Sequence, residues 1–351
     1  MNAIARIVRS SLLLAAIGWL AGCGGNKQTL HLYTWQDYLD PELVAAFEKA
    51  NNCRVMIDTF DSNESMYAKV QAGSSGYDVI FPSSYQVALM AKNNHIQKLD
   101  KSRLPNVVKH FDKTYAPLMI DPEMTYNVPY AITFTGLAYR KDKIEDTPID
   151  SWDCLKDDRF NGRISLLNDM RETIGAALKK LGYSVNSVNE AELDKALALV
   201  LEWKKHIAKF DNEQYKTGVA GGEFIIGHGY NGDVSQVMAD APDKIGFSLP
   251  KEGFTAACDE MVIPTTAQNV DLAYAFINFM YEGEHAKVNM EYIQGPMPVK
   301  PGIDALDEDF RKTIVLSPET LKNGQVLGAL DDAAQELYNK AWDRIKATSE
   351  K

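Results

Sequence analysis

The sequence predicts an α/β fold of two lobes, and three observations support this. The chain has 351 residues, which at roughly 100 to 200 residues per domain suits two domains that each bury a core. Strand-like apolar segments alternate with helix-like segments, which is typical of mostly parallel sheets covered by helices. Hydrophobic residues make up 45% and charged residues 24% of the chain, a composition that excludes disordered, collagen-like and multispanning membrane proteins. A cleft between the lobes is therefore available for a ligand.

The first 22 residues are predicted to be a signal peptide. Arg6 and Arg9 precede an apolar run over 12–20, which is too short to span a bilayer as a mature helix. Two small residues follow, directly before Cys23. This order resembles the bacterial lipobox, in which the cysteine carries a diacylglycerol anchor after cleavage, and residues 23–29 would then form a lipidated tether. The alternative is an ordinary secretory signal with an incidental cysteine. Either signal places the mature chain on the periplasmic or cell-surface side.

The mature chain would be strongly acidic and would hold three further cysteines. Removal of the signal peptide leaves 35 basic against 48 acidic residues, a net charge of −13. Such a surface repels nucleic acid and suits a cationic partner, although it could equally serve solubility alone. Cys53, Cys154 and Cys258 cannot all pair with one another. Because the chain has no Cys-x-x-Cys or His-x-x-x-His pair, we expect neither a metal nor another cofactor.

The elements of the first lobe follow in order from the tether. A strand is predicted over 30–33, and a helix follows with Asp40 as its cap and a proline at its first position. A second strand over 54–60 leads into a helix that begins near Asn63. The third strand lies over 77–81, so that strand and helix alternate as a parallel sheet requires.

The second lobe is predicted to begin after an extended X-Pro step at 127–130. Its elements are a strand over 132–139, a strand over 163–167, a helix from Arg171, a helix over 190–208 and a strand over 223–227. The chain returns near 261–264, and a helix over 271–281 is apolar nearly all round, so we expect it to be buried. The predicted lobes are therefore 30–131 plus 262–300, and 132–261 plus 301–351.

Local signatures of an enzyme are absent from the sequence. The chain has no Gly-x-Ser-x-Gly elbow, no P-loop and no Gly-x-Gly-x-x-Gly after a strand. The glycine-rich segments 73–76 and 227–229 lack the required spacing, and both are predicted to be turns. We therefore predict a binding protein and not an enzyme.

Aromatic and acidic side chains follow several of the predicted strands. Ligands of open α/β sheets bind beyond the carboxyl ends of the strands. The candidates are Trp35, Asp37 and Tyr38 after the first strand, Ser83 and Tyr85 after the third, Asp169 and Glu172 at a helix start in the second lobe, and Asp259 before the return crossing. Together they offer aromatic faces and several carboxylates to one cleft.

This set of side chains suits a flexible dication or polycation. Ammonium groups need charge-assisted hydrogen bonds from carboxylates, and an ammonium over an aromatic face gains about 0.5 to 2 kcal/mol. Two alternatives stay open: Asp169 and Glu172 could only stabilise a helix start, and Trp35 and Tyr38 could be core aromatics.

Eight ordered segments of the chain resemble a known family. They lie at 33–38, 62–69, 77–83, 127–130, 168–172, 180–184, 250–253 and 319–324. In these segments, and from about Leu30 to Lys346 overall, the chain resembles the spermidine/putrescine-binding substrate-binding proteins of bacterial ABC importers.

The resemblance implies a fold and a role for each candidate. The fold would be the periplasmic-binding-protein type II fold, with two α/β lobes of mostly parallel sheets joined by a hinge and the ligand in the interlobe cleft. Trp35, Tyr38, Tyr85 and Tyr230 would form aromatic walls, Ser83 and Asp37 would contact one amine end, Asp169 and Glu172 would form an acidic pair, and Asp259 would meet an inner amine. Ala257, Gly295 and Leu327 depart from the family at positions expected to face the ligand.

The function implied is that of an extracytoplasmic lipoprotein, acting as a monomer. It would capture a polyamine of the putrescine or spermidine kind by hinge closure and deliver it to an ABC permease with its ATPase. Two alternatives stay open. The same lobes could report the ligand to a membrane receptor, or the importer could serve a different cationic amine.

Overall fold

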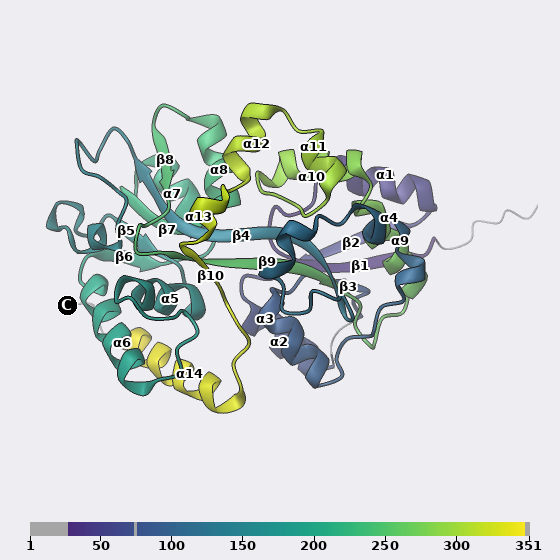
Figure 1. The fold of residues 1–351 in the computed structure, drawn as a ribbon, viewed down its shortest axis with the longest axis horizontal. Coiled ribbons are helices and arrows are strands. Elements are labelled where there is room, and N and C mark those ends of the chain that lie inside the picture. Colours follow the sequence, from purple (N-terminus) through teal and green to yellow (C-terminus); the bar gives the residue numbers. More distant parts are fainter. Residues whose placement is uncertain (1–26, 74–75, 348–351) are drawn as a thin grey trace, which may run out of the picture.

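Two long strands connect the two halves of the structure, a computed structural model that describes residues 27–73 and 76–347. β4 (Asn127–Arg140) and β9 (Phe254–Val262) pair antiparallel, and they run side by side through the middle of the molecule (Figure 1). The strand order is β2-β1-β3-β9-β4-β7-β5-β6, with β10 on β9 and β8 on β4. The predicted signal peptide and Cys23 lie outside the described residues.

The first half is built on three parallel strands. β1 (Thr29–Thr34) lies between β2 (Arg54–Thr59) and β3 (Val79–Ile80), and β3 joins β9. Its helices are α1 (Pro41–Asn51), α2 (Asn63–Gln71), α3 (Ser84–Lys92), α4 (Pro105–His110), α9 (Val270–Met280), α10 (Gly283–Ile293), α11 (Lys300–Asp304) and α12 (Glu308–Ile314). The Asp40 carboxylate accepts hydrogen bonds from the first backbone N–H groups of α1, so the predicted cap is confirmed.

The second half repeats the arrangement on the other side of the crossing strands. β5 (Ile164–Leu166) is parallel to both β6 (Ile207–Phe210) and β7 (Ile226–Tyr230), and β7 and β8 (Ile245–Ser248) each pair antiparallel with β4. Its further elements are α5 (Met170–Lys180), α6 (Glu190–Lys204), α7 (Tyr215–Gly221), α8 (Asn231–Asp240), α13 (Pro318–Leu321), β10 (Gly324–Val326) and α14 (Asp332–Ala347). Short 3-10 helices lie at Lys101–Arg103, Lys113–Leu118, Trp152–Lys156 and Asp158–Phe160.

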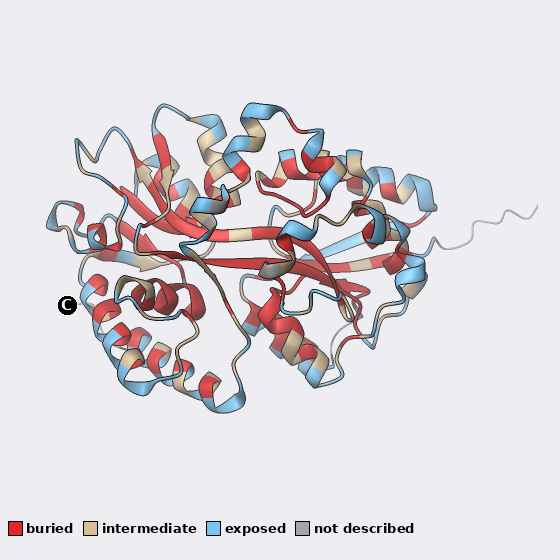
Figure 2. Cartoon of the chain, in the orientation of Figure 1, coloured by how far each residue is buried: buried red, intermediate tan, exposed pale blue. Residues whose placement is uncertain are grey.

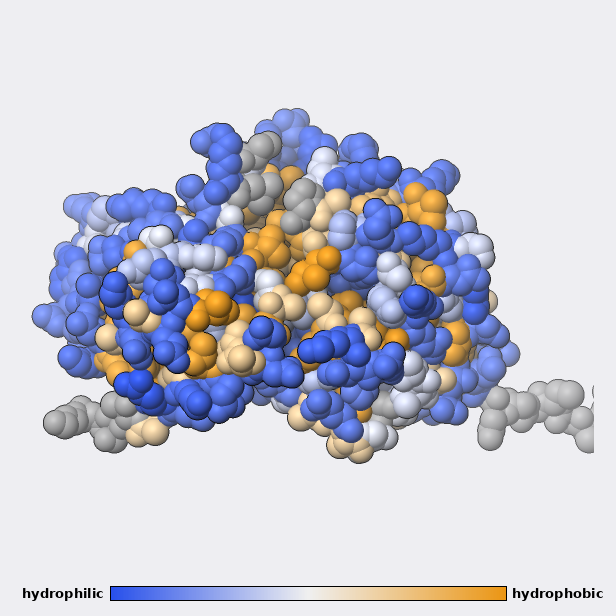
Figure 3. Space-filling model, turned by 60° about the horizontal axis from the view of Figure 1, so that its bottom comes forward, coloured by the Kyte–Doolittle hydropathy of each residue, from blue (hydrophilic) through white to orange (hydrophobic). Residues whose placement is uncertain are grey.

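Each half buries its own hydrophobic core. Phe47, Phe276 and Ile277 belong to the first core, and Trp152 and Trp203 belong to the second. Buried residues fill most of β4 and β9, and exposed ones lie on the outer faces of the helices (Figure 2). On one face of the molecule, hydrophilic side chains surround apolar ones that gather near the middle (Figure 3). None of the helices within 27–73 and 76–347 has the length and apolar character of a membrane span.

The structure confirms most of the predicted elements and changes three of them. The strand predicted over 223–227 begins three residues later, as β7. The helix predicted over 190–208 ends at Lys204, and a separate edge strand, β6, begins at Ile207. The turn predicted at 227–229 is wrong, because these residues lie inside β7. The ring of Tyr215 from α7 packs so closely against this strand that a Cβ atom on Gly229 would lie 2.1 Å from it. Close packing against a helix, and not a turn, therefore explains these glycines.

Three cysteines are free and buried. Cys53, Cys154 and Cys258 form no disulfide in the described part of the chain. Burial raises the pKa of the Cys154 thiol to about 12, so this thiol stays protonated and inert at neutral pH.

Replacing Gly229 by alanine is expected to destabilise the fold by on the order of 1–3 kcal/mol, as for other overpacked core positions. The Tyr215 ring cannot move aside easily, because its hydroxyl donates to Asp233 at 2.7 Å and accepts from the Tyr230 N–H at 2.9 Å. Thermal unfolding should show a lower melting temperature. The matched control is Gly221→Ala at the end of α7, where a Cβ would meet nothing within 4 Å; equal melting temperatures for the two variants would contradict the packing argument.

Candidate functional site

A cleft between the two halves gathers the residues that sequence analysis selected. It encloses about 880 Å³, including its open mouth, and all nine predicted site residues line it: Trp35, Asp37, Tyr38, Ser83, Tyr85, Asp169, Glu172, Tyr230 and Asp259. They lie at or beyond the carboxyl ends of β1, β3, β5 and β7, apart from Asp259 on the crossing strand β9. The rule that open α/β sheets bind ligands beyond these strand ends therefore locates the cleft.

Asp259 lies at the centre of the cleft wall, and each of its carboxylate oxygens accepts one hydrogen bond from the protein. Ser83 Oγ donates to Oδ1 at 2.6 Å, and the Tyr38 hydroxyl donates to Oδ2 at 2.6 Å. Asn63 Nδ2 donates to Ser83 Oγ at 3.1 Å and so helps to orient it. Because a carboxylate oxygen can accept two hydrogen bonds, each oxygen keeps capacity for one more donor. Burial raises the pKa of Asp259 to about 6, against the lowering effect of the two hydroxyl donors.

Asp169 and Glu172 form a second acidic group at the start of α5. Asp169 Oδ1 accepts from the backbone N–H groups of Arg171 and Glu172 at 2.9 and 3.0 Å, and Oδ2 accepts from the Tyr230 hydroxyl at 3.1 Å. One oxygen therefore caps the helix and the other accepts from a residue of the cleft wall, and a ligand contact for Asp169 stays a prediction. Glu172 accepts from the Thr135 hydroxyl at 2.9 Å and also from Thr255.

Burial dominates the electrostatics of this acidic pair. It is the largest cause that raises the pKa of both carboxyls, and the neighbouring charge of Asp169 adds to the effect at Glu172, whose pKa rises to about 8. Two buried carboxyls this close resist ionisation together unless a cation joins them. The pair therefore favours a positively charged ligand.

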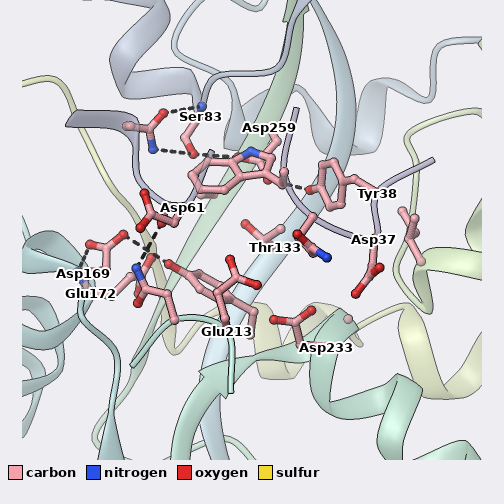
Figure 4. A pocket seen from close by; sticks show the side chains of 18 of the residues that line it. Asp37, Tyr38, Asp61, Ser83, Thr133, Asp169, Glu172, Glu213, Asp233 and Asp259 are labelled. Carbon is pink, nitrogen blue, oxygen red and sulfur yellow. Dashed lines mark hydrogen bonds between the residues drawn. The ribbon is translucent and has the colours of Figure 1, made fainter. Parts of the chain in front are cut away.

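A third acidic group lies at the opposite end of the cleft. Asp37 follows β1, in a left-handed backbone conformation with φ of 52°, and Asp233 lies in the first turn of α8. In the close-up view, Asp169 and Glu172 lie at one end, Asp37 and Asp233 at the other, and Asp259 between them (Figure 4). These five carboxylates thus form three groups along the cleft, and Asp61 and Glu213 line it as well.

The aromatic side chains form part of the walls. Trp35 is half-buried and packs against Phe60, with ring centroids 4.3 Å apart, and Tyr38 packs against Tyr130 at 5.3 Å. Each of the two contacts the core with one face and still lines the cleft. Core packing and site lining, which the sequence left as alternatives, therefore occur together.

The comparison with known families assigns this architecture. A model of the bacterial extracellular solute-binding proteins matches residues 42–315, which is most of the chain. The chain belongs to this family. Members of this family bind solutes. The assignment of the chain to the family therefore agrees with the prediction of a binding protein and not an enzyme. Among the described residues, no group of three or more His, Cys, Asp or Glu side chains could hold a metal ion.

Relatives within the solute-binding family cover nearly the whole chain. A putrescine/cadaverine-binding protein of Pseudomonas aeruginosa is 31% identical over 97% of this chain and 99% of its own. The spermidine/putrescine-binding periplasmic protein of Escherichia coli is 32% identical over 95% of both chains. The crystal structure of the TpPotD lipoprotein of Treponema pallidum is 32% identical and superposes with a TM-score of 0.82, covering 91% of this chain and 99% of that one. The predicted fold class is thereby confirmed.

Two of the three departures from the family lie on the cleft wall. Ala257 and Leu327 line the cleft, as expected. Gly295 is not among the lining residues, and Ile293, two residues earlier, lines the cleft. A Cβ atom added at Gly295 would lie 3.8–3.9 Å from Asn231 and Ile293, which is ordinary van der Waals contact.

Sequence analysis missed several polar residues of this solute-binding cleft. They are Gln36, Asp61, Asn63, Thr133, Asn212, Glu213, Lys216, Asp233 and Gln236. Asp61 and Asn63 follow β2, and Asn212, Glu213 and Lys216 follow β6. The strand-end rule would have found the second group if β6 had been recognised.

Proposed function

We propose that this solute-binding protein captures a polyamine in the cleft and delivers it to an ABC importer. The observation that carries the proposal is the buried Asp259 carboxylate, whose two oxygens each hold one hydroxyl donor and can each accept one more. An ammonium or a secondary amine supplies such donors together with the compensating charge. The related proteins of Pseudomonas aeruginosa and Escherichia coli, which are named for putrescine, cadaverine and spermidine, support the same ligand class.

The nine predicted residues have distinct roles in this proposal. Asp259 pairs with one amine, and Asp169 with Glu172 pairs with another. Trp35, Tyr38, Tyr85 and Tyr230 supply flat walls for the methylene chain, and Ser83 orients Asp259. Asp37 lies at the far end, where its carboxylate has a partner within the protein.

We further propose that the cleft closes by a hinge between the two halves, with β4 and β9 as the crossing strands; α11 and α12, predicted in the second lobe, pack in the first core. Contacts already join the two sides: Asn212 Nδ2 donates to the Asp61 carbonyl at 3.0 Å, and Gln236 Nε2 donates to the Tyr292 carbonyl at 3.5 Å. Such contacts suit a closed form that ligand binding stabilises. Anchoring through lipid on Cys23 completes the proposal, and the lipoprotein from Treponema pallidum supports it.

Calorimetric titration of the soluble chain from residue 24 tests the ligand class. The protein is first unfolded and refolded to remove any bound ligand. We expect saturable binding of at least one of putrescine, cadaverine, agmatine, spermidine and spermine, and no saturable binding of arginine or lysine, whose carboxylates would face the acidic cleft. Absence of heat with all five polyamines, from protein with native thermal unfolding, would overturn the proposed ligand class.

A further inference from the structure

A lysine of the protein itself occupies one end of the cleft. Of the side chains that line the cleft in the described part of the chain, Lys216 alone is basic. Its Nζ lies 3.2 Å from Asp37 Oδ2 and 3.1 Å from Asp233 Oδ1, and it also donates to Gln236 Oε1 at 3.4 Å. The side chain is only 13% exposed, so this ammonium is largely removed from water.

The surroundings of Lys216 are those that an amine end of a ligand would require. Two carboxylates and an amide oxygen accept its three N–H groups, which satisfies an ammonium completely. The charges of Asp233 and Asp37 raise the lysine pKa despite burial, so the group stays cationic. At this end of the cleft, an ammonium from the protein stands where a ligand ammonium would otherwise be held.

Its neighbours hold Lys216 in place. It is the second residue of α7, next to Tyr215, whose hydroxyl donates to the same Asp233 carboxylate at 2.7 Å. Asp37 approaches from the first half of the molecule and Asp233 from the second. Because the Lys216 ammonium already offsets the charge of these two carboxylates, a third ligand ammonium at this end would face a like charge.

We propose that Lys216 acts as a built-in ammonium that fills one of the three acidic positions of the cleft and restricts it to ligands with two ammonium groups. This inference rests on the proposed polyamine-binding function. Two positions remain for the ligand: Asp259, and the pair Asp169 and Glu172. A diamine such as putrescine matches them, whereas the third ammonium of a triamine such as spermidine meets Lys216. The residue therefore determines ligand length.

The test compares putrescine and spermidine on wild-type protein, Lys216→Met and Lys209→Met. Methionine keeps much of the length of the lysine side chain and removes the charge. Lys209 is the matched control, because it lies on the neighbouring β6, pairs with Asp211 at 2.9 Å and does not line the cleft. Both ligands are titrated by calorimetry at one pH and one salt concentration.

We expect wild-type protein to bind putrescine at least as tightly as spermidine. Lys216→Met should raise the affinity for spermidine relative to putrescine by at least tenfold, and Lys209→Met should leave that ratio unchanged. Adding Asp37→Asn to Lys216→Met should cancel most of the gain, because it removes one of the carboxylates that became free. Lys216→Gln provides the same comparison if the methionine variant fails to fold.

Other outcomes separate the inference from the function on which it rests. If wild-type protein binds both polyamines, Lys216→Met could change both affinities equally or abolish both. Either result would make Lys216 a general electrostatic or interlobe contact and would overturn its length-restricting role. A spermidine preference in wild-type protein would overturn it as well. If wild-type protein bound no polyamine, the proposed function itself would be overturned, and this inference with it.

Discussion

Replacing Asp259 by asparagine is expected to weaken polyamine binding by more than tenfold. The carboxylate is buried, and its oxygens accept from Ser83 and Tyr38. An amide in its place has no charge to offset the desolvated ammonium. Its N–H₂ group would also replace one of the two carboxylate oxygens, and as a donor it would face another donor there. Removing one partner of a buried ion pair typically costs about 3–5 kcal/mol, which corresponds to roughly a hundredfold or more in affinity, so tenfold is a lower bound. Titration of the refolded protein with putrescine measures it.

Glu260→Gln is the matched control for this substitution. Glu260 is the next residue of β9 and is also buried, but its carboxyl accepts from Ser84 and does not line the cleft. Burial raises its pKa to about 8, so this carboxyl is mostly neutral at pH 7 and glutamine is a mild replacement. We expect the control to bind putrescine within about twofold of wild type, on the view that an uncharged buried group contributes little to a distant cation. An unchanged dissociation constant in Asp259→Asn would remove Asp259 from the site.

The sequence locates this cleft well because most candidates follow a strand that is easily recognised, whereas Asp259 lies within β9. β1 ends directly before Trp35, β3 ends three residues before Ser83, and the helix start at Asp169 carries its own capping pattern. Sheet topology then brings these distant segments to one edge without further information. Local pattern and global fold agree at these positions.

The residues that were missed depend on contacts that local patterns do not contain. β6 follows α6 after only two residues and lies at the sheet edge, so its short sequence merges with the helical pattern before it. Glu213 and Lys216, which follow β6, were therefore not predicted as site residues. Gly229 was predicted to lie in a turn because the feature that requires a glycine there, the ring of Tyr215, lies on another element. The pairing of Lys216 with Asp37 joins positions 179 residues apart and needs the folded chain to be seen.

Polyamine affinity is expected to rise with pH between pH 6 and pH 8. In the free protein, burial raises the pKa of Glu172 to about 8 and that of Asp259 to about 6. A bound cation favours the ionised form of each carboxyl and so lowers both pKa values. Below its free pKa, each carboxyl must lose a proton before it can pair with the ligand, and affinity falls by up to about tenfold per pH unit for each such group. Putrescine stays doubly charged in this range, since primary amines titrate near pH 10.

Calorimetry at pH 6, 7 and 8 should show at least a tenfold gain in affinity across the range. At pH 7, titrations in buffers of different ionisation enthalpy should show protons released on binding, with Glu172 among the groups that release them. Glu172→Gln separates the two groups: it should bind more weakly than wild type at pH 8 and release fewer protons at pH 7, while the smaller pH dependence near pH 6 that belongs to Asp259 persists. Proton uptake on binding, or an affinity independent of pH, would mean that the ligand does not pair with these buried carboxyls.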